Sequence, residues 1–255
     1  MKRSFVIAKK DFKTYFISPI GYLVLSSFLL VTGFMFYQRL LFFVRQSFIG
    51  SQTGEPVTAT LNDAIIKPLY GTINLLFLFL IPLITMRLIS EEKKQKTMEL
   101  LLTCPISSGQ IVVGKFLSAL FLITLTLVCT LTYPLILYIG GNPDMGQVFT
   151  MYIGLVLLSA CYISVGVFWS TLTENQIIAA VLTFISLLFL WIIDWGAQNS
   201  SQLMTSTIYY ISIMRHFESF GEGMINIKDT VYYLSFCSIA LYLSYLGIEK
   251  QRGSL

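Results

Sequence analysis

The sequence has few charged residues for its length. Only 12% of its 255 residues are Asp, Glu, Lys or Arg, whereas 55% are hydrophobic. Ordinary soluble domains contain about 25% charged residues. A soluble domain of this size cannot bury so much apolar surface, which argues against a cytosolic enzyme. The net charge of +4 is small and the basic residues are scattered, which argues against a nucleic-acid partner.

The residues and motifs of common catalytic sites are also scarce. His216 is the single histidine, and the sequence contains no phosphate-binding loop, HExxH or GxSxG motif. The four cysteines form no CxxC pair and are expected to be small buried thiols. We therefore expect no catalytic residue, no metal site and no bound cofactor in this chain. Energy for any uphill step must then come from a partner.

Charged residues divide the sequence into six long uncharged runs. Each run has at least 19 residues, and about 20 helical residues cross a hydrocarbon core of ~30 Å. The runs are Thr14–Gln38, Pro68–Met86, Phe116–Pro143, Met145–Thr173, Asn175–Ile193 and Thr230–Ile248. The sequence therefore predicts an all-α integral membrane protein with six transmembrane helices, forming a single domain over residues 1–255. A seventh run, Trp195–Met214, is rejected because its consecutive polar residues would lie unpaired in lipid.

Basic residues indicate how these helices are oriented in the membrane. Twelve Lys and Arg residues lie in the N-terminal segment, the loop after the second span and the C-terminal tail, whereas five lie on the opposite side. Cytoplasmic segments of membrane proteins carry the excess of Lys and Arg. Both termini are therefore predicted to be cytoplasmic.

The N-terminal segment, residues 1–18, has a helical pattern of its own. Phe5, Ala8, Phe12 and Tyr15 recur at helical spacing opposite the basic residues, which predicts an amphipathic helix lying in the membrane interface. Ser18-Pro19 should end this helix before the first span. A frayed basic tail that only sets the orientation is the alternative.

The loop after the second span, residues 90–107, is the most informative stretch. A charged cluster, Glu91–Lys96, precedes a short helix on which Met98, Leu101 and Leu102 share one face. Pro105 follows that helix, and Ser107 with Gln110 forms a capping box that should begin the third span. Such a helix suits docking into a groove on another protein. An ordinary charged loop with an interfacial turn explains the pattern equally well.

The same loop resembles that of type-2 ABC exporter permeases. The resemblance lies in Glu91-Glu92-Lys93-Lys94, Thr97-Met98-Glu99-Leu100-Leu101-Leu102, Pro105-Ile106-Ser107 and Gly114-Lys115. Two other stretches are similar to the gliding-motility (GldF-like) and nitrous-oxide-reductase-maturation (NosY-like) branch of these permeases. They are Ser18-Pro19-Ile20-Gly21-Tyr22 and the stretch from His216-Phe217 through Phe220, Gly223 and Asp229 to Tyr233. Lys96 departs from the pattern, since many relatives have glycine before the threonine.

The resemblance implies a role for each of these segments. In that family the loop contains the coupling helix that contacts the ATP-hydrolysing subunit, which implies a coupling role for Glu91, Glu92, Thr97, Met98, Glu99, Leu101, Leu102, Pro105 and Ser107. It also implies short re-entrant helices within residues 196–228, on the outer side between the fifth and sixth spans. There His216, Phe217, Phe220 and Gly223 would shape the outer mouth. A histidine that is simply hydrogen-bonded at headgroup level is the alternative for His216.

We therefore expect a permease subunit of an ATP-binding-cassette transporter in a bacterial cytoplasmic (inner) membrane. The resemblance implies separate ABC ATPase subunits that hold ATP and Mg, a second permease chain and an auxiliary membrane subunit with a periplasmic domain. A subunit that transmits motion to a periplasmic partner without moving a substrate is the main alternative. A membrane enzyme is disfavoured by the single histidine and by the lack of paired intramembrane acids.

Overall fold

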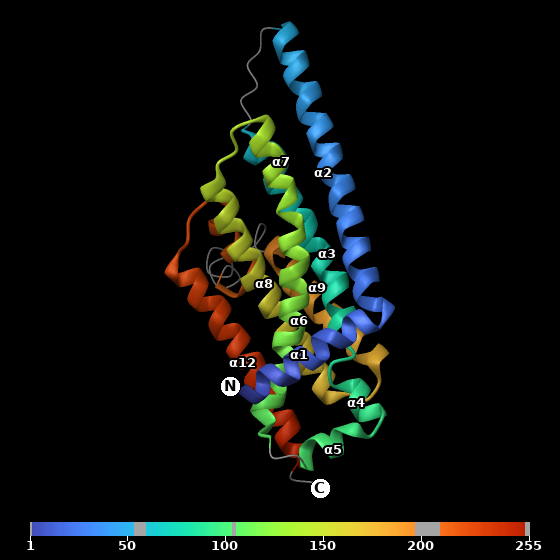
Figure 1. Ribbon diagram of the computed structural model, residues 1–255. Coiled ribbons are helices and arrows are strands. Elements are labelled where there is room, and N and C mark those ends of the chain that lie inside the picture. The colour runs from blue at the N-terminus through green and yellow to red at the C-terminus, as the bar shows by residue number, and fades with distance from the viewer. Residues whose placement is uncertain (1, 54–59, 104–105, 197–209, 253–255) are drawn as a thin grey trace.

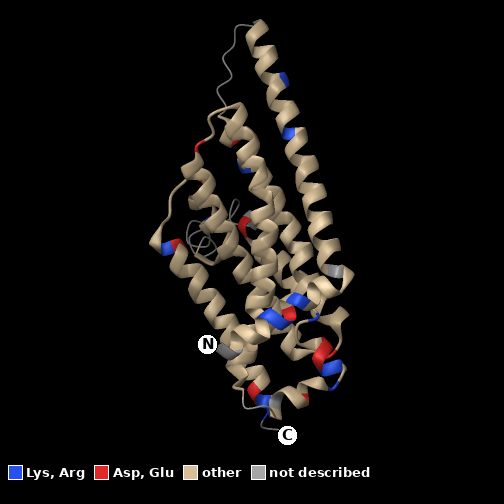
Figure 2. Cartoon of the chain, in the orientation of Figure 1, with Lys and Arg blue, Asp and Glu red and all other residues tan. Residues whose placement is uncertain are grey.

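The computed structural model describes residues 2–53, 60–103, 106–196 and 210–252. All regular structure in these ranges is helical, and the helices form one elongated bundle (Figure 1). Charged residues gather at the end of the bundle where α1 (Lys2–Ile17), α4 (Ser90–Lys94) and α5 (Thr97–Thr103) lie, and they are sparse along the middle of the long helices (Figure 2). This end is called the α4 end below. The opposite end is called the α11 end after α11 (Ile213–Gly221).

Six helical stretches of the described chain are long and apolar enough to cross a membrane, as predicted. They are Gly21–Gln52, Asn62–Lys94, Ser108–Gly140, Met145–Leu172, Gln176–Asp194 and Ile227–Arg252. The first corresponds to α2 (Pro19–Thr53), and the second to the π-helical turn η1 (Asn62–Ile66) with α3 (Lys67–Thr85) and α4 (Ser90–Lys94). The third comprises α6 (Ser108–Thr130) and α7 (Thr132–Gly140), and the last three are α8 (Met145–Leu172), α9 (Gln176–Gly196) and α12 (Ile227–Arg252). The chain is therefore a multi-pass membrane protein.

Some helices begin or end at residues other than the ends of the uncharged runs. Helix α1 (Lys2–Ile17) ends before Ser18, and α2 starts at Pro19, where the sequence predicts a break. However, α2 continues past Arg39 and Arg45, because a helix that leaves the hydrocarbon can carry charge in water. The third span is interrupted at Leu131, three residues before Pro134.

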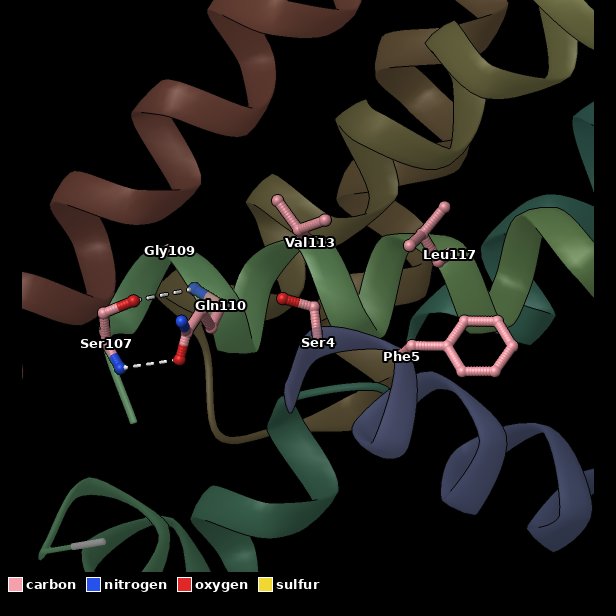
Figure 3. A pocket seen from close by; sticks show the side chains of 7 residues that line it. All are labelled: Ser4, Phe5, Ser107, Gly109, Gln110, Val113 and Leu117. Carbon is pink, nitrogen blue, oxygen red and sulfur yellow. Dashed lines mark hydrogen bonds between the residues drawn. The ribbon is translucent and has the colours of Figure 1, made fainter. Parts of the chain in front are cut away.

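Helix α1 lies across the start of α6 (Figure 3). The two backbones approach closely at Gly114, where a Cβ atom would lie 2.9 Å from both the Ile7 Cβ and the Ser4 carbonyl oxygen. Ala8 and Tyr15 are buried, whereas Phe5 is 55% exposed. Ser4 and Ile7 contact α6 at the crossing. An exposed Phe5 is compatible with a helix whose apolar face meets lipid, and the position of α1 in the membrane interface stays a prediction.

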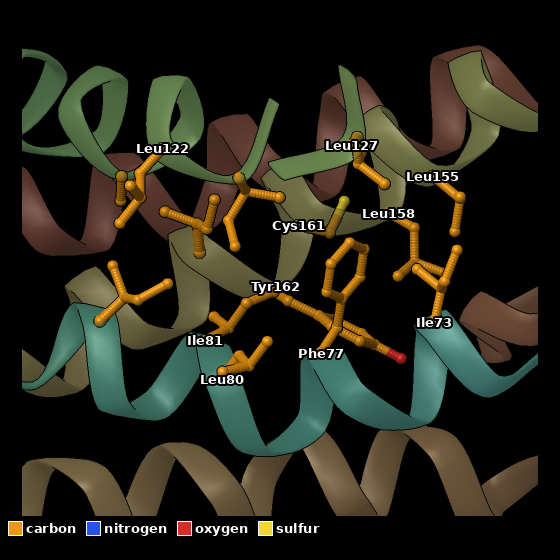
Figure 4. Close-up of a cluster of buried hydrophobic side chains, with 14 of the residues drawn as sticks. Ile73, Phe77, Leu80, Ile81, Leu122, Leu127, Leu155, Leu158, Cys161 and Tyr162 are labelled. Atoms are coloured by element: carbon orange, nitrogen blue, oxygen red, sulfur yellow. The ribbon is translucent and has the colours of Figure 1, made fainter. Parts of the chain in front are cut away.

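The core lies between α3, α6 and α8, whose apolar side chains interdigitate (Figure 4). Helix α8 is the central element, since it packs against α3, α6, α9, α11 (Ile213–Gly221) and α12. Three of its residues, Leu155, Cys161 and Tyr162, are completely buried. By contrast, α2, α9 and α12 are mostly exposed and have apolar outer faces. In a bilayer these faces meet lipid or another chain.

Candidate functional site

Residues 90–103 of the predicted coupling loop form two short helices, α4 (Ser90–Lys94) and α5 (Thr97–Thr103). A tight turn at Gln95 and Lys96 separates them, and Lys96 has φ 56°. This is the left-handed region, which costs a residue with a Cβ about 1–2 kcal/mol and costs glycine almost nothing. Lys96, which departs from the pattern that the loop resembles, is thus the residue with this backbone conformation.

The start of α4 is bound to the end of α8 by hydrogen bonds. The Ser170 Oγ accepts from the backbone nitrogens of Ile89 and Ser90, each at 3.1 Å. The Ser90 hydroxyl donates to the Ser170 carbonyl oxygen at 3.2 Å, and the Lys93 ammonium donates to the Thr171 carbonyl. Ser90 and Ser170 are both completely buried, so these bonds are shielded from water. Helix α4 is therefore fastened directly to the end of α8.

Lys115 connects α4 to two further helices. Its Nζ lies 2.6 Å from the Glu92 Oε1 of α4 and 3.0 Å from the Asp11 Oδ2 of α1, and its side chain is 4% exposed. Because a buried ammonium needs anionic partners, this lysine on α6 holds α1 and α4 in place. In the same region, burial raises the pKa of the Tyr15 hydroxyl on α1 above its ordinary value.

A cavity of about 670 Å³ opens beside this cluster. Its lining combines Lys10 and Asp11 from α1, Arg87 from the turn after α3, and Glu91 from α4. Leu100 and Leu101 of α5 contribute apolar surface. The α4 end therefore offers a recess with both charged and apolar walls.

Helix α5 does not present the face that its pattern predicts. Met98 is only 4% exposed and belongs to the chain's own core, and Leu101 packs against that core. Met98 is thus covered within the isolated chain, and its role in coupling stays a prediction. The exposed residues of α5 are Thr97, Glu99, Leu100 and Thr103, and Leu100, the large apolar one, is 69% exposed. Pro105 and the side chain of Leu102 lie outside the described residues.

The end of the loop is fixed by the capping box that the sequence predicts. The Ser107 Oγ accepts from the Gln110 backbone nitrogen at 3.3 Å, and the Ser107 nitrogen donates to the Gln110 Oε1 at 3.4 Å. Arg252 near the C-terminal end of α12 donates to the Ile106 carbonyl oxygen at 3.2 Å. The loop is thus fastened at its start to α8 and at its end to α12.

At the α11 end, His216 is part of a buried polar cluster. Its Nδ1 lies 2.6 Å from the Asp229 Oδ1, and its ring stacks on Tyr232 with centroids 3.9 Å apart. His216 is 5% and Asp229 6% exposed. This pair joins α11 to α12, while Arg215 Nε joins α11 to the end of α9 through Asp194 Oδ1 at 3.0 Å.

Helix α11 also packs tightly onto α8. The Gln147 Nε2 donates to the Gly221 carbonyl at 2.7 Å, and the Thr150 hydroxyl donates to the Phe220 carbonyl at 3.0 Å. A Cβ at Gly154 would lie 2.8 Å from the Phe220 Cβ, so glycine permits this contact.

The residues predicted at the outer mouth contribute mainly to this packing. Phe217 and Phe220 are buried, and Gly223 ends the following turn with φ +83°. A role of these residues in an outer opening stays a prediction. Of the predicted re-entrant segment, residues 197–209 lie outside the described residues.

The described residues contain no group of three or more His, Cys, Asp or Glu side chains that could hold a metal ion. Sequence comparison gives the chain its family. The profile of the ABC-2 family transporter proteins matches residues 5–247, which is nearly the whole chain. The chain belongs to the ABC-2 transporter family. A comparison with curated proteins found no match.

Membership of the ABC-2 family identifies the kind of subunit that the chain forms. The family consists of membrane subunits of ABC transporters, which associate with ABC ATPase subunits and do not themselves hydrolyse ATP. The chain is thus a permease subunit. Sequence reasoning missed Asp11, Ser170 and Arg252, because each contacts a partner at least 80 residues away in the sequence. No local pattern marks such pairs.

Proposed function

We propose that this ABC-2 permease subunit couples ATP hydrolysis by a partner ATPase to export or to other conformational work across the membrane. One observation carries the proposal: α8 is bonded to α4 at one end and to α11 at the other. Its 28 residues span roughly 42 Å at 1.5 Å per residue. A packed helix of this length transmits displacement from end to end.

The α4 end is the proposed ATPase-binding side. Glu91, Glu92, Thr97 and Glu99 with Leu100 form its polar and apolar surface, and Lys115 and Ser170 connect that surface to the spans. ATP and Mg would be held by the ATPase. Binding of ATP would move α4 and α5, and the spans would shift between inward-open and outward-open arrangements. This arrangement places both termini and the α4 end in the cytoplasm of a bacterial cell, and the α11 end outside.

The partners of this subunit follow from the same arrangement. Six spans are few to enclose a path, so we propose that a second permease chain, identical or different, pairs with the exposed faces. The resemblance to the gliding-motility and nitrous-oxide-reductase-maturation branch supports an auxiliary subunit with a periplasmic domain. It also supports the second candidate, transmission of motion to a periplasmic partner without transport.

The experiment combines reconstitution with a variant of the α8 contact. The permease and its ATPase would be placed in vesicles, and ATP hydrolysis would be measured with candidate substrates and with the periplasmic partner. Stimulation by a substrate favours export, whereas stimulation only by the partner favours transmission.

The variant Ser170→Ala tests the contact between α4 and α8. It removes the acceptor of two buried backbone N–H groups, and each such group costs about 1–3 kcal/mol of stability when it is left unpaired. We expect this variant to assemble with the ATPase but to lose most of the stimulation.

A matched control tests whether the effect is specific. Ser159 lies on the same helix, is completely buried, and its hydroxyl donates to the Val156 carbonyl within α8. Ser159→Ala should therefore keep the stimulation. If Ser170→Ala and Ser159→Ala behave alike, α8 does not carry the coupling. If the purified permease hydrolyses ATP without any ATPase subunit, the proposed division of labour is wrong.

A further inference from the structure

A groove of about 780 Å³ lies between α1 and the first turns of α6 (Figure 3). Small-molecule sites usually have volumes of about 300–1,000 Å³, so the groove is large enough for a ligand. It is separate from the coupling loop's charged cavity and from the outer cluster of His216. None of its lining residues takes part in the proposed coupling contacts, apart from the loop's last residue, Ser107.

The lining of the groove is apolar along most of its length and polar at one end. Phe5 of α1 and Val113 and Leu117 of α6 form the apolar part, and Gly109 leaves space because it has no side chain. Ser107 and Gln110 form the polar end, where α6 begins, and Ser4 adds a hydroxyl at the side. The groove therefore fits a molecule with a long apolar part and a polar head.

The apolar part of the groove continues into the exposed face of α6. Val113, Phe121, Leu125 and Val128 of α6 are 36–53% exposed, and Phe5 contacts Phe121 edge-to-face. In a membrane-spanning helix such a face lies against hydrocarbon. The groove is thus an inward branch of a lipid-facing surface, and an acyl chain can enter it without leaving the hydrocarbon.

The sequence next to the groove is basic, which favours an anionic head. Helix α1 begins at Lys2, so two basic residues, Lys2 and Arg3, directly precede the groove residues Ser4 and Phe5. Arg252 donates to the carbonyl oxygen of Ile106, next to Ser107. The N-terminus of α6, which carries a partial positive charge, also lies there. Glu249 is the carboxylate nearby, but it accepts from Ser108, whose side chain is buried and does not line the groove.

We propose that this groove binds one acyl chain of an anionic phospholipid, with the phosphate at the Ser107 end. The bound lipid fills the space between α1 and α6 and supports the crossing at Gly114. It is distinct from any transported substrate, and the proposal stands whether the permease exports a molecule or transmits motion.

The test is native mass spectrometry of the full-length permease, together with any ATPase that copurifies, after exchange into phosphatidylglycerol and phosphatidylcholine. The wild-type chain should retain one phosphatidylglycerol with roughly tenfold preference, since each basic residue near the head adds to the attraction. Val113→Trp should fill the groove and abolish this retention. Val128→Trp makes the same change on the same helix outside the groove and should leave it intact.

A second pair of variants separates the head from the chain. Lys2→Gln with Arg3→Gln should remove the preference for phosphatidylglycerol, whereas Lys9→Gln with Lys13→Gln, an equal change of charge on α1, should not.

Gly109→Leu is a second variant that blocks the groove, and it is used if Val113→Trp shows reduced helix content by circular dichroism. Retention of no lipid by the wild-type chain overturns the proposal. So does undiminished retention in both blocked variants, or a blocked variant that loses a protein partner while keeping its lipid.

Discussion

Lys115 and Glu92 form a buried ion pair, with Nζ and Oε1 2.6 Å apart, that joins the start of α6 to α4. The lysine side chain is 4% exposed and also contacts Asp11 of α1. Exposed ion pairs usually contribute less than about 1 kcal/mol, but a buried charge that loses its partner destabilises a protein by about 3–5 kcal/mol. Lys115 is therefore expected to hold the α4 end together.

The first prediction concerns this pair. Lys115→Met leaves two carboxylates without their cation and should lower the unfolding midpoint of the detergent-solubilised chain by an amount equivalent to roughly 3–5 kcal/mol. Lys67→Met makes the same change in the exposed pair with Asp63 and should cost less than about 1 kcal/mol. Equal shifts for the two variants would show that the buried pair has no special importance.

The second prediction concerns Lys96. Its φ of 56° strains a residue that has a Cβ, so Lys96→Gly should raise stability by roughly 0.5–1 kcal/mol after the extra chain entropy of glycine is subtracted. Lys94→Gly, two residues earlier in the regular α4 helix, should instead lower stability by about 1 kcal/mol. Thermal unfolding of both variants measures the difference. A loss of stability in Lys96→Gly contradicts the left-handed turn.

The spans were predictable because membrane helices leave a strong one-dimensional signal. A long, predominantly apolar run without charge can cross hydrocarbon only as a helix, and the six predicted spans correspond to six described helical stretches. The capping box at Ser107 was predictable for the same reason, since it depends on residues three apart. The C-terminal end of α2 was not predictable, because charge no longer limits a helix once it leaves the membrane.

The exposed face of α5 could not be predicted from its sequence. Helical spacing places Met98 and Leu101 together, but it does not say whether their cover is another protein or the chain's own core. The answer depends on α4 and α5 packing back on the bundle, which rests on contacts with Lys115 and Ser170 that are distant in sequence. The coupling role of this segment stays a prediction, and we propose that its contact face includes the exposed Glu99 and Leu100.

The third prediction concerns this contact face. Leu100→Asp alters an exposed position and should reduce copurification of the ATPase while leaving the stability of the chain within about 0.5 kcal/mol. Met98→Ala should have the opposite profile, with a loss of about 2–5 kcal/mol in stability because it opens a cavity in the core. Pull-down yield and thermal unfolding are measured on each variant.

Glu99→Gln removes a charge at the rim of the proposed contact surface. It should leave the complex with the ATPase assembled while weakening the coupling between ATP hydrolysis and function.

If Leu100→Asp retains the ATPase at the wild-type level, α5 is not the contact surface. The coupling segment would then have to act through α4 alone, whose exposed positions include Lys94. Lys94→Asp is the follow-up variant, because it reverses the charge of an exposed residue without entering the core.

The fourth prediction concerns topology. The distribution of basic residues predicts that the α4 end lies in the cytoplasm and that the outer end of α2 lies outside the cell. In a cysteine-free background, a membrane-impermeant thiol reagent added to intact cells should label a cysteine placed at Ser51, an exposed residue near the end of α2. The same reagent should not label a cysteine placed at Gln95, an exposed residue in the turn between α4 and α5.

Permeabilised cells provide the control for the topology experiment. Both engineered cysteines should react once the membrane is opened, because both side chains are exposed in the folded chain. A cysteine at Gln95 that stays unreactive after permeabilisation would indicate cover by the ATPase, and removing the ATPase should then restore labelling. Labelling at Gln95 in intact cells would place α4 and α5 outside. No cytoplasmic ATPase could then reach them, so the coupling role of the loop would have to be abandoned together with the orientation.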